Sequence, residues 1–433
     1  MTKSTGESGF TLFTLFTLFT SPLGAQPFSP VVKRLDMSEA VRLSQLNNPA
    51  LLASLEEISI VEQHLRMARH LNYPQFGFDA LAADFRGERN FILTEGFGGL
   101  LLAPGDPRYL YMGRGTIEQN LYTGGRTSNA IILAKAGLEK AQTMRDKTAR
   151  RVIRDVRTSF ERVLYMRGLA NLSGEMASLA NAFRPSESES AQARLAWEEL
   201  SASLDALSSR SQARAIGQSN LALLRAIGMD LSSEVDIVGD LQDGNLVKIV
   251  PSPEQTLSWA REYRPEYKAE ALESEMDATQ VAIALASRNP VISLAGMYEL
   301  LDPRFPLRTA NWAGMIRVHL PFSWDSWNTI RERRAQQRKG QVRRVEIDDA
   351  ISLEVRQAHA DLVSALAAWE RQEKRSELWK ELYPKAVATE RSLEGKIRLF
   401  ERYVQARLGR VDALHDALRA RYEFEHAVGR DLE

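Results

Sequence analysis

The sequence predicts a mainly helical chain with a smaller β portion, in which one structural unit occurs twice. Two pairs of prolines recur at the same interval, Pro49 with Pro265 and Pro74 with Pro290. After each second proline, apolar and polar residues alternate as they do in strands. Further along, the apolar residues repeat every three or four positions, as they do in helices. Such an internal repeat indicates two similar units that build one architecture together.

Each unit is expected to begin with a short amphipathic helix, a bend and a longer helix. Proline stops a helix because it lacks an N–H donor, and it biases the residue before it toward extended backbone. Pro49 and Pro265 therefore separate the two helices, and Pro74 and Pro290 open a strand. These four prolines define the repeat.

Two strands are expected after each second proline. Their approximate ranges are 75–86 and 109–123 in the first unit, and 291–301 and 311–322 in the second. The alternation separates Ile316 and Val318 on one face from Arg317 and His319 on the other. About ten residues of such alternation suit a tilted strand of an outer membrane barrel. A soluble hairpin with one face in water has the same period.

The stretch "LYTGGRTSNAIILA", which starts at Leu121, changes from strand period to helix period at Gly124 and Gly125. Glycine supplies the backbone freedom that an abrupt strand-to-helix junction requires. In the second unit "LPFSWDSWNTI" makes the same change after Pro321, without a glycine pair.

Long helices follow each pair of strands, from Ser128 to about Phe183 and from about Asn328 to Arg391, with Pro384 the one marked interruption. The second helix carries a heptad seam at Ile351, Val355, Ala358, Leu362, Ala365 and Trp369. Such a seam packs lengthwise against a neighbouring helix, as in a coiled coil. The chain is thereby divided into a signal peptide (1–25), a first repeat (26–228), a linker (229–251) and a second repeat (252–433).

The N-terminal stretch "TLFTLFTLFT" is a short apolar segment that is followed by the small residues Gly24 and Ala25. This order is typical of a secretory signal peptide, cleaved after Ala25. An apolar tail without a targeting role is the alternative.

Composition excludes several classes of function. Charge is balanced, with 56 basic and 56 acidic residues, and the basic run "RERRAQQRKGQVRR" lacks interleaved aromatic residues, so no nucleic-acid partner is expected. That run fits a solvated helix face or, as a second choice, a cationic tunnel lining. Cysteine is absent, which excludes disulfides and lipidation through cysteine. The six histidines show no metal-ligand spacing, so we expect no enzyme, metal or cofactor site.

Several segments, taken in order and duplicated, resemble the outer membrane efflux protein family, the TolC-like exit ducts. They are "MSEAVRLSQLNNPAL", "LNYPQFGFDA", "IEQNLYTGGRTSNA", "RPEYKAEALESEMDATQVAIALASRNPVISL", "VHLPFSW", "ELYPKAVATERSLEGK" and "EHAVGRDL". The segment "ELYPKAV" is similar to the heavy-metal branch of that family. The resemblance covers the chain from about Leu35 onward.

The resemblance implies a homotrimer in the outer membrane of a Gram-negative bacterium. Each chain would give four strands to a twelve-stranded barrel, which is continued into the periplasm by a long α-helical coiled-coil tunnel. It further implies a passive conduit of a tripartite efflux or type I secretion system. Its partners would be outer membrane lipid, a periplasmic adaptor protein and an inner-membrane transporter of the RND or ABC type.

Relatives often constrict the tunnel with inward acidic residues near its periplasmic tips. Here the two tip regions carry Glu187 and Glu189 in one turn and Arg398, Glu401 and Arg402 after the other. We expect Arg398 or Arg402 to pair with the acids of a neighbouring hairpin, and so to hold the tunnel shut or to contact the adaptor. The alternative is that all five are solvated charges that contribute well under ~1 kcal/mol per pair.

The competing hypothesis is a soluble or periplasmic coiled-coil scaffold whose apparent strands are loops. The alternation within residues 113–121 and 312–320 discriminates between the two, because a barrel requires it and a scaffold does not.

Overall fold

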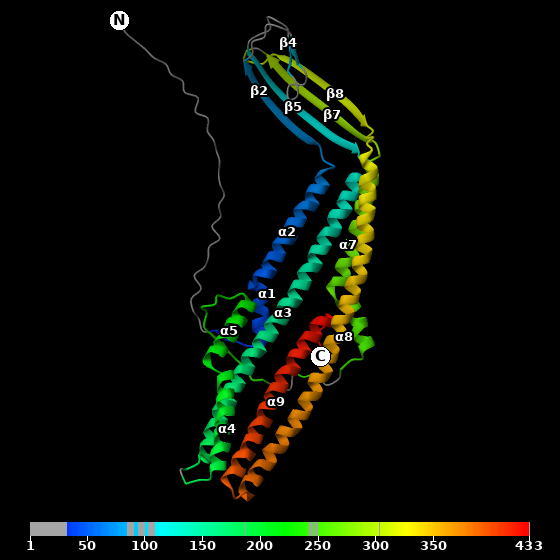
Figure 1. The fold of residues 1–433 in the computed structure, drawn as a ribbon. Helices are drawn as coiled ribbons and strands as arrows, with labels where there is room; N and C mark the ends of the chain where they lie inside the picture. The colour runs from blue at the N-terminus through cyan, green and yellow to red at the C-terminus, as the bar shows by residue number, and fades with distance from the viewer. Residues whose placement is uncertain are drawn as a thin grey trace, which may run out of the picture.

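The structure is a computed structural model that describes residues 33–84, 91–93, 100–102, 109–186, 188–241, 246, 250–302 and 304–432. The expected signal peptide lies outside these residues. A four-stranded sheet lies at one end of an elongated molecule, and long helices run from it to the other end (Figure 1). The predicted fold class, mainly helical with four strands in one sheet, is confirmed.

The elements follow the order of the repeat. The first half contains β1 (Lys33–Leu35), α1 (Met37–Asn47), α2 (Pro49–His70), β2 (Gln75–Asp84), β3 (Phe91–Leu93), β4 (Leu100–Leu102), β5 (Tyr109–Tyr122), α3 (Arg126–Ala180), the 3₁₀ turn η1 (Asn181–Phe183), α4 (Ala191–Arg210) and α5 (Ala213–Ile227). The second half contains β6 (Val235–Ile237), α6 (Pro253–Tyr263), α7 (Pro265–Ala286), β7 (Val291–Asp302), β8 (Thr309–His319), α8 (Asp325–Thr389) and α9 (Leu393–Val428).

The sheet is antiparallel, with strand order β2-β5-β7-β8. The helices joined to these strands keep the same order, because α2 packs on α3, α3 on α7 and α7 on α8. Strands β2 and β8 are the sheet's two edges in the described part of the chain, and α2 and α8 continue those edges (Figure 1).

The two halves tie their helix ends together in the same way. Asn48, which precedes Pro49, accepts a hydrogen bond from the backbone N–H of Ala50 and donates one to the carbonyl of Ala226 near the end of α5, at 2.8 Å. In the second half Arg264 takes this place and donates to the carbonyl of Ala427 at 3.2 Å. Each side chain thus fixes the start of one helix against the end of another.

Helices α5 and α9 both end at a glycine in the left-handed region, Gly228 at φ 82° and Gly429 at φ 76°. A Cβ on Gly228 would lie 2.5 Å from the backbone oxygen of Asn47, so the position also requires close backbone approach. Glycine meets both demands because it has no side chain.

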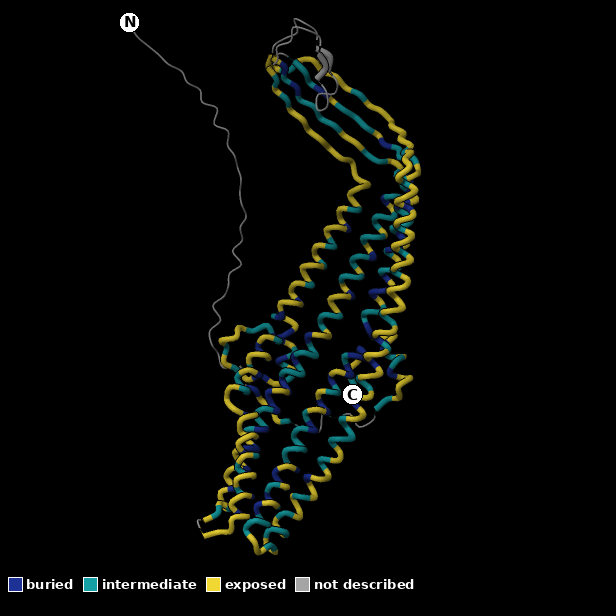
Figure 2. The backbone as a smooth tube through the Cα atoms, viewed as in Figure 1, coloured by how far each residue is buried: buried dark blue, intermediate teal, exposed yellow. Residues whose placement is uncertain are grey.

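Apolar clusters follow one another along the helices, while much of the outer helix surface is exposed (Figure 2). The predicted seam of α8 is confirmed where it meets α9: Ile351, Val355 and Leu362 are buried, and Ala358 packs on their cluster. Among the described helices, none combines the length and the apolar character needed to cross a membrane.

Four local features differ from the sequence prediction. Strand β6, within the expected linker, pairs in parallel with β1. The helical segment that follows the tip of the first half is interrupted between Arg210 and Ala213, where α4 ends and α5 begins. Helix α8 continues through Pro384. The segment between β2 and β5, where no strand was expected, includes the paired strands β3 and β4. Three-residue strands are too short for periodicity to reveal. Pro384 removes one N–H donor from α8, and a long helix that packs along α9 tolerates that loss.

Candidate functional site

One face of the sheet is apolar and exposed. Cross-strand pairing places Phe78, Gly115, Tyr298 and Trp312 in one row across all four strands. The large exposed side chains of this face are Phe76, Phe78, Ile117, Leu294, Tyr298, Trp312, Ile316 and Val318. Trp312 is 80% exposed, so in one chain this surface lacks the cover that apolar side chains normally have.

The opposite face is polar toward the helices and apolar at its far end, where Leu110 and Met112 are buried. Its neighbouring row consists of Asp79, Arg114, Glu299 and Asn311. The Arg114 guanidinium donates to the Glu299 carboxylate at 2.6 Å, and both side chains are largely buried. The predicted alternation of the strands is therefore confirmed.

A cavity of about 490 Å³ opens on this polar face where the sheet meets the helices. Its polar lining includes Glu118, Asn120, Arg126, Ser293, Arg317 and His319. Arg317 lies 3.6 Å from Glu118, so charges of both signs face the cavity. The polar face therefore continues to the junction with the helices.

The two strand-to-helix junctions differ in construction. Gly124 and Gly125 adopt φ of 66° and 90°, and the amide of Asn289 donates to the Gly124 carbonyl at 2.8 Å. At the second junction Pro321 lies in the connection between β8 and α8, and the Ser323 hydroxyl accepts a hydrogen bond from the backbone N–H of Asp325 at 3.1 Å.

The tip residues lie at the end of the molecule remote from the sheet (Figure 1). Glu187 lies outside the described residues, and Glu189 is exposed in the turn before α4. Arg398 pairs with Glu394 of its own helix at 2.7 Å, and Glu401 accepts a hydrogen bond from Gln405. Arg402 is exposed. Within one chain, the described contacts bring Arg398 to Glu394 and not to Glu189.

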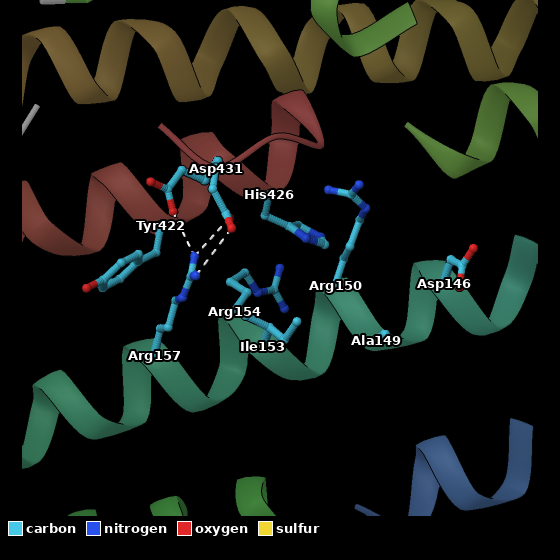
Figure 3. A pocket seen from close by; sticks show the side chains of 10 residues that line it. Asp146, Ala149, Arg150, Ile153, Arg154, Arg157, Tyr422, His426 and Asp431 are labelled. Carbon is cyan, nitrogen blue, oxygen red and sulfur yellow. Dashed lines mark hydrogen bonds and ion pairs between the residues drawn. The ribbon is translucent and has the colours of Figure 1, made fainter. Parts of the chain in front are cut away.

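A polar cluster between α3 and α9 was not predicted (Figure 3). Arg157 of α3 donates to Glu425 and to Asp431, both at 3.0 Å, beside a cavity of about 350 Å³. The spacing of Arg150, Arg154 and Arg157 on one helix face was the available signal. Each of the three guanidiniums contacts an acid or a carbonyl, which indicates a structural tie between the helices.

Glu161, one turn further along α3, is 3% exposed. Burial raises the pKa of its carboxyl to about 8, and the hydroxyl of Tyr422 and the guanidinium of Arg421 offset only part of that effect. Burial also raises the pKa of Tyr422. Across the described ranges, no three potential metal ligands come together.

Comparison with solved structures finds the same architecture in outer membrane channels. The open-state MtrE channel of Neisseria gonorrhoeae superposes with a TM-score of 0.75 at 16% identity, over 92% of this chain and 89% of that chain. The CmeC channel of Campylobacter jejuni gives 0.73 at 14%, over 91% and 85%. The outer membrane protein VceC of Vibrio cholerae gives 0.70 at 12%, over 92% and 97%. No protein-family model and no curated protein sequence matches the chain.

These likenesses cover nearly the whole chain, and they confirm at the level of the fold the resemblance to TolC-like outer membrane channels.

Proposed function

We propose that the chain is one protomer of a passive outer membrane channel, the exit duct of a tripartite efflux or type I secretion system. The observation that carries the proposal is a four-stranded sheet with one apolar face, one polar face and two open edges. Lipid would cover the apolar face, and the polar face would line the water-filled conduit.

Four strands cannot close a barrel, and an open edge in lipid leaves backbone groups without hydrogen bonds. Pairing of β8 of one copy with β2 of the next removes both edges. Three copies then give a twelve-stranded barrel, within the range of outer membrane barrels. The similar solved structures are outer membrane channels, which supports this arrangement.

The helices would carry the conduit into the periplasm. At ~1.5 Å per residue, the 65 residues of α8 extend over roughly 100 Å. We place a periplasmic adaptor at the tips and an inner-membrane transporter of the RND or ABC type beyond it. The transporter would supply the energy, and residues 1–25 would direct export before removal.

The tips would hold the closed state. Arg398 would exchange Glu394 for Glu187 or Glu189 of a neighbouring hairpin, with Arg402 and Glu401 beside it. Arg398→Glu should then raise single-channel conductance in planar bilayers, because like charges would separate the hairpins. Unchanged conductance would exclude the latch and leave the channel proposal intact.

The deciding experiment is the mass of the protein purified from outer membranes in detergent, measured by light scattering. A trimer that conducts ions in planar bilayers is the expected result. A monomer or dimer that needs no detergent would instead favour the coiled-coil scaffold, although the strands that this alternative treats as loops are present in the fold.

A further inference from the structure

Helix α8 carries a basic face that its own chain leaves uncovered. Arg331, Arg338 and Lys339 are exposed, and the described residues offer them no ion pair. The side of α8 that faces α7 is marked by Arg333, which donates to Gln280 of α7 at 3.0 Å. At ~100° per residue, Arg331 and Lys339 point away from α7.

Apolar side chains continue the same face of α8. Val342 is 62% exposed and Leu353 is 58% exposed, and Ala335 lies between the charged positions. From Arg331 to Val342 this face therefore carries cationic and apolar side chains, and the exposed acids Glu346 and Asp349 follow on the same side before Leu353.

Helix α2, at the other edge of the molecule, carries a complementary face. It packs on α3 through the buried Leu51 and Leu65. The side turned away from α3 presents the exposed Leu52, Glu56 and Ile60, and Glu56 has no ion pair within the described ranges. Glu56 thus lies between two apolar side chains here, and its charge is opposite to that of Arg338 and Lys339.

The two faces lie at matching heights. Glu56 precedes the sheet end of α2 by about as many residues as Lys339 follows the sheet end of α8, roughly 20 Å at ~1.5 Å per residue. Within one chain α3 and α7 lie between α2 and α8. Closure of the ring proposed above brings α8 of one copy beside α2 of the next.

We propose that a charged seam joins neighbouring copies below the barrel, in which Lys339 and Arg338 of α8 pair with Glu56 of α2 in a second copy. Val342 packs on Leu52, and Ala335 packs on Ile60. The seam rests on the proposed trimer, and it specifies the residues that join the copies outside the membrane.

The seam would also select the way in which copies associate. Arg331, Arg338 and Lys339 of one α8 would repel the same residues of a second α8, so symmetric pairing through two α8 helices is disfavoured. Contact of α8 with α2 of the next copy is instead a head-to-tail contact, which forms a ring when the rotation between copies closes.

Because the chain contains no cysteine, a cross-linking test with introduced cysteines has no background from native thiols. Leu52→Cys combined with Val342→Cys, treated in outer membranes with a short bismaleimide, should give covalent dimers and trimers on denaturing gels. The matched control combines Leu52→Cys with Gln336→Cys, since Gln336 is exposed on a different side of α8. Each single variant should stay monomeric on the gel.

A charge-reversal series gives a second readout. Glu56→Lys or Lys339→Glu alone should lower the trimer fraction about threefold in dilute detergent at low salt, because repulsion repeats at all three contacts. The double reversal should restore it. A trimer by light scattering without the cross-link and without this rescue overturns the seam alone, whereas a wild-type monomer overturns the trimer as well.

Discussion

At the scale of single residues, Glu161 is the group whose chemistry depends most on the fold. Its carboxyl has an ordinary pKa near 4.5 when exposed, and burial between α3 and α9 raises the pKa to about 8 in the folded protein. Between these values the folded state holds a proton that the unfolded state releases. Stability therefore falls as pH rises from 4.5 to 8, and the loss is complete above 8.

Glu161→Gln should remove this dependence, because the amide stays neutral at every pH. We expect similar melting temperatures for variant and wild type at pH 5, and a more stable variant at pH 8.5. At ~1.4 kcal/mol per pKa unit the gap is on the order of a few kcal/mol. Thermal melts followed by circular dichroism measure it, with the exposed Glu199→Gln as control. A gap independent of pH would contradict the argument.

The glycine pair at the first junction allows a graded test. Gly124→Ala combines a positive φ with a new Cβ 2.4 Å from the Cβ of Asn289, whereas Gly125→Ala meets no atom closer than 3.8 Å. We expect Gly124→Ala to cost about 3 kcal/mol or more and Gly125→Ala about 1 kcal/mol. The yield and melting temperature of purified protein should follow that order. Equal effects would mean that the approach of Asn289 is unimportant.

At the scale of elements, helix ends carry much of the fold's specificity. Asn48 serves two helices at once, as N-cap of α2 and as donor to the last turn of α5. Asn48→Ala should cost about 2 kcal/mol, since it removes a cap and leaves the partly buried Ala226 carbonyl without this partner.

The variant Asn48→Ser separates the two contributions of Asn48, the cap of α2 and the hydrogen bond to α5. Serine can still cap α2, but its short side chain cannot reach Ala226 across the gap that the Asn48 amide spans. Its cost in a denaturation experiment should therefore lie about halfway between wild type and Asn48→Ala. A serine variant as unstable as the alanine variant would assign the whole effect to the bond with α5.

Sequence patterns predicted the elements that repeat a period many times. The alternation around Ile316 and Arg317 assigned both faces of β8, and the heptads of α8 identified its seam with α9. The paired strands β1 and β6 are too short to show a period, and the break before Ala213 follows no proline or glycine. Burial of Glu161 depends on packing between helices far apart in the chain, so no local pattern signals it.

In the candidate site, too, only the features that follow from a local sequence pattern could be predicted. The polar and apolar faces of the sheet followed from alternation, and the glycine pair followed from a change of period. The partners of the tip residues did not follow from any pattern, because Arg398 pairs with Glu394 within its own helix in the described part of the chain. Charge on a helix surface does not by itself identify its partner.

At the scale of the whole molecule, adjacent residues of β8 should respond in opposite ways. Ile316 is 69% exposed on the apolar face, and Arg317 lines the cavity on the polar face. Ile316→Arg should strongly reduce assembled channel in outer membranes, since a lipid-facing arginine costs about 2–4 kcal/mol near the bilayer midplane. Arg317→Gln should assemble normally and change the ion selectivity of the pore. Normal assembly of Ile316→Arg would place that face away from lipid.

The unbroken course of α8 restricts how this chain can change in length. Helix α8 packs on α9 both at Ile351 and at Tyr383, so the same side of the helix must meet its partner over many turns. One inserted residue would rotate everything beyond it by ~100°, whereas seven would restore nearly the original orientation. Such a conduit can grow or shorten in evolution by whole heptads, and α9 must gain or lose the same number.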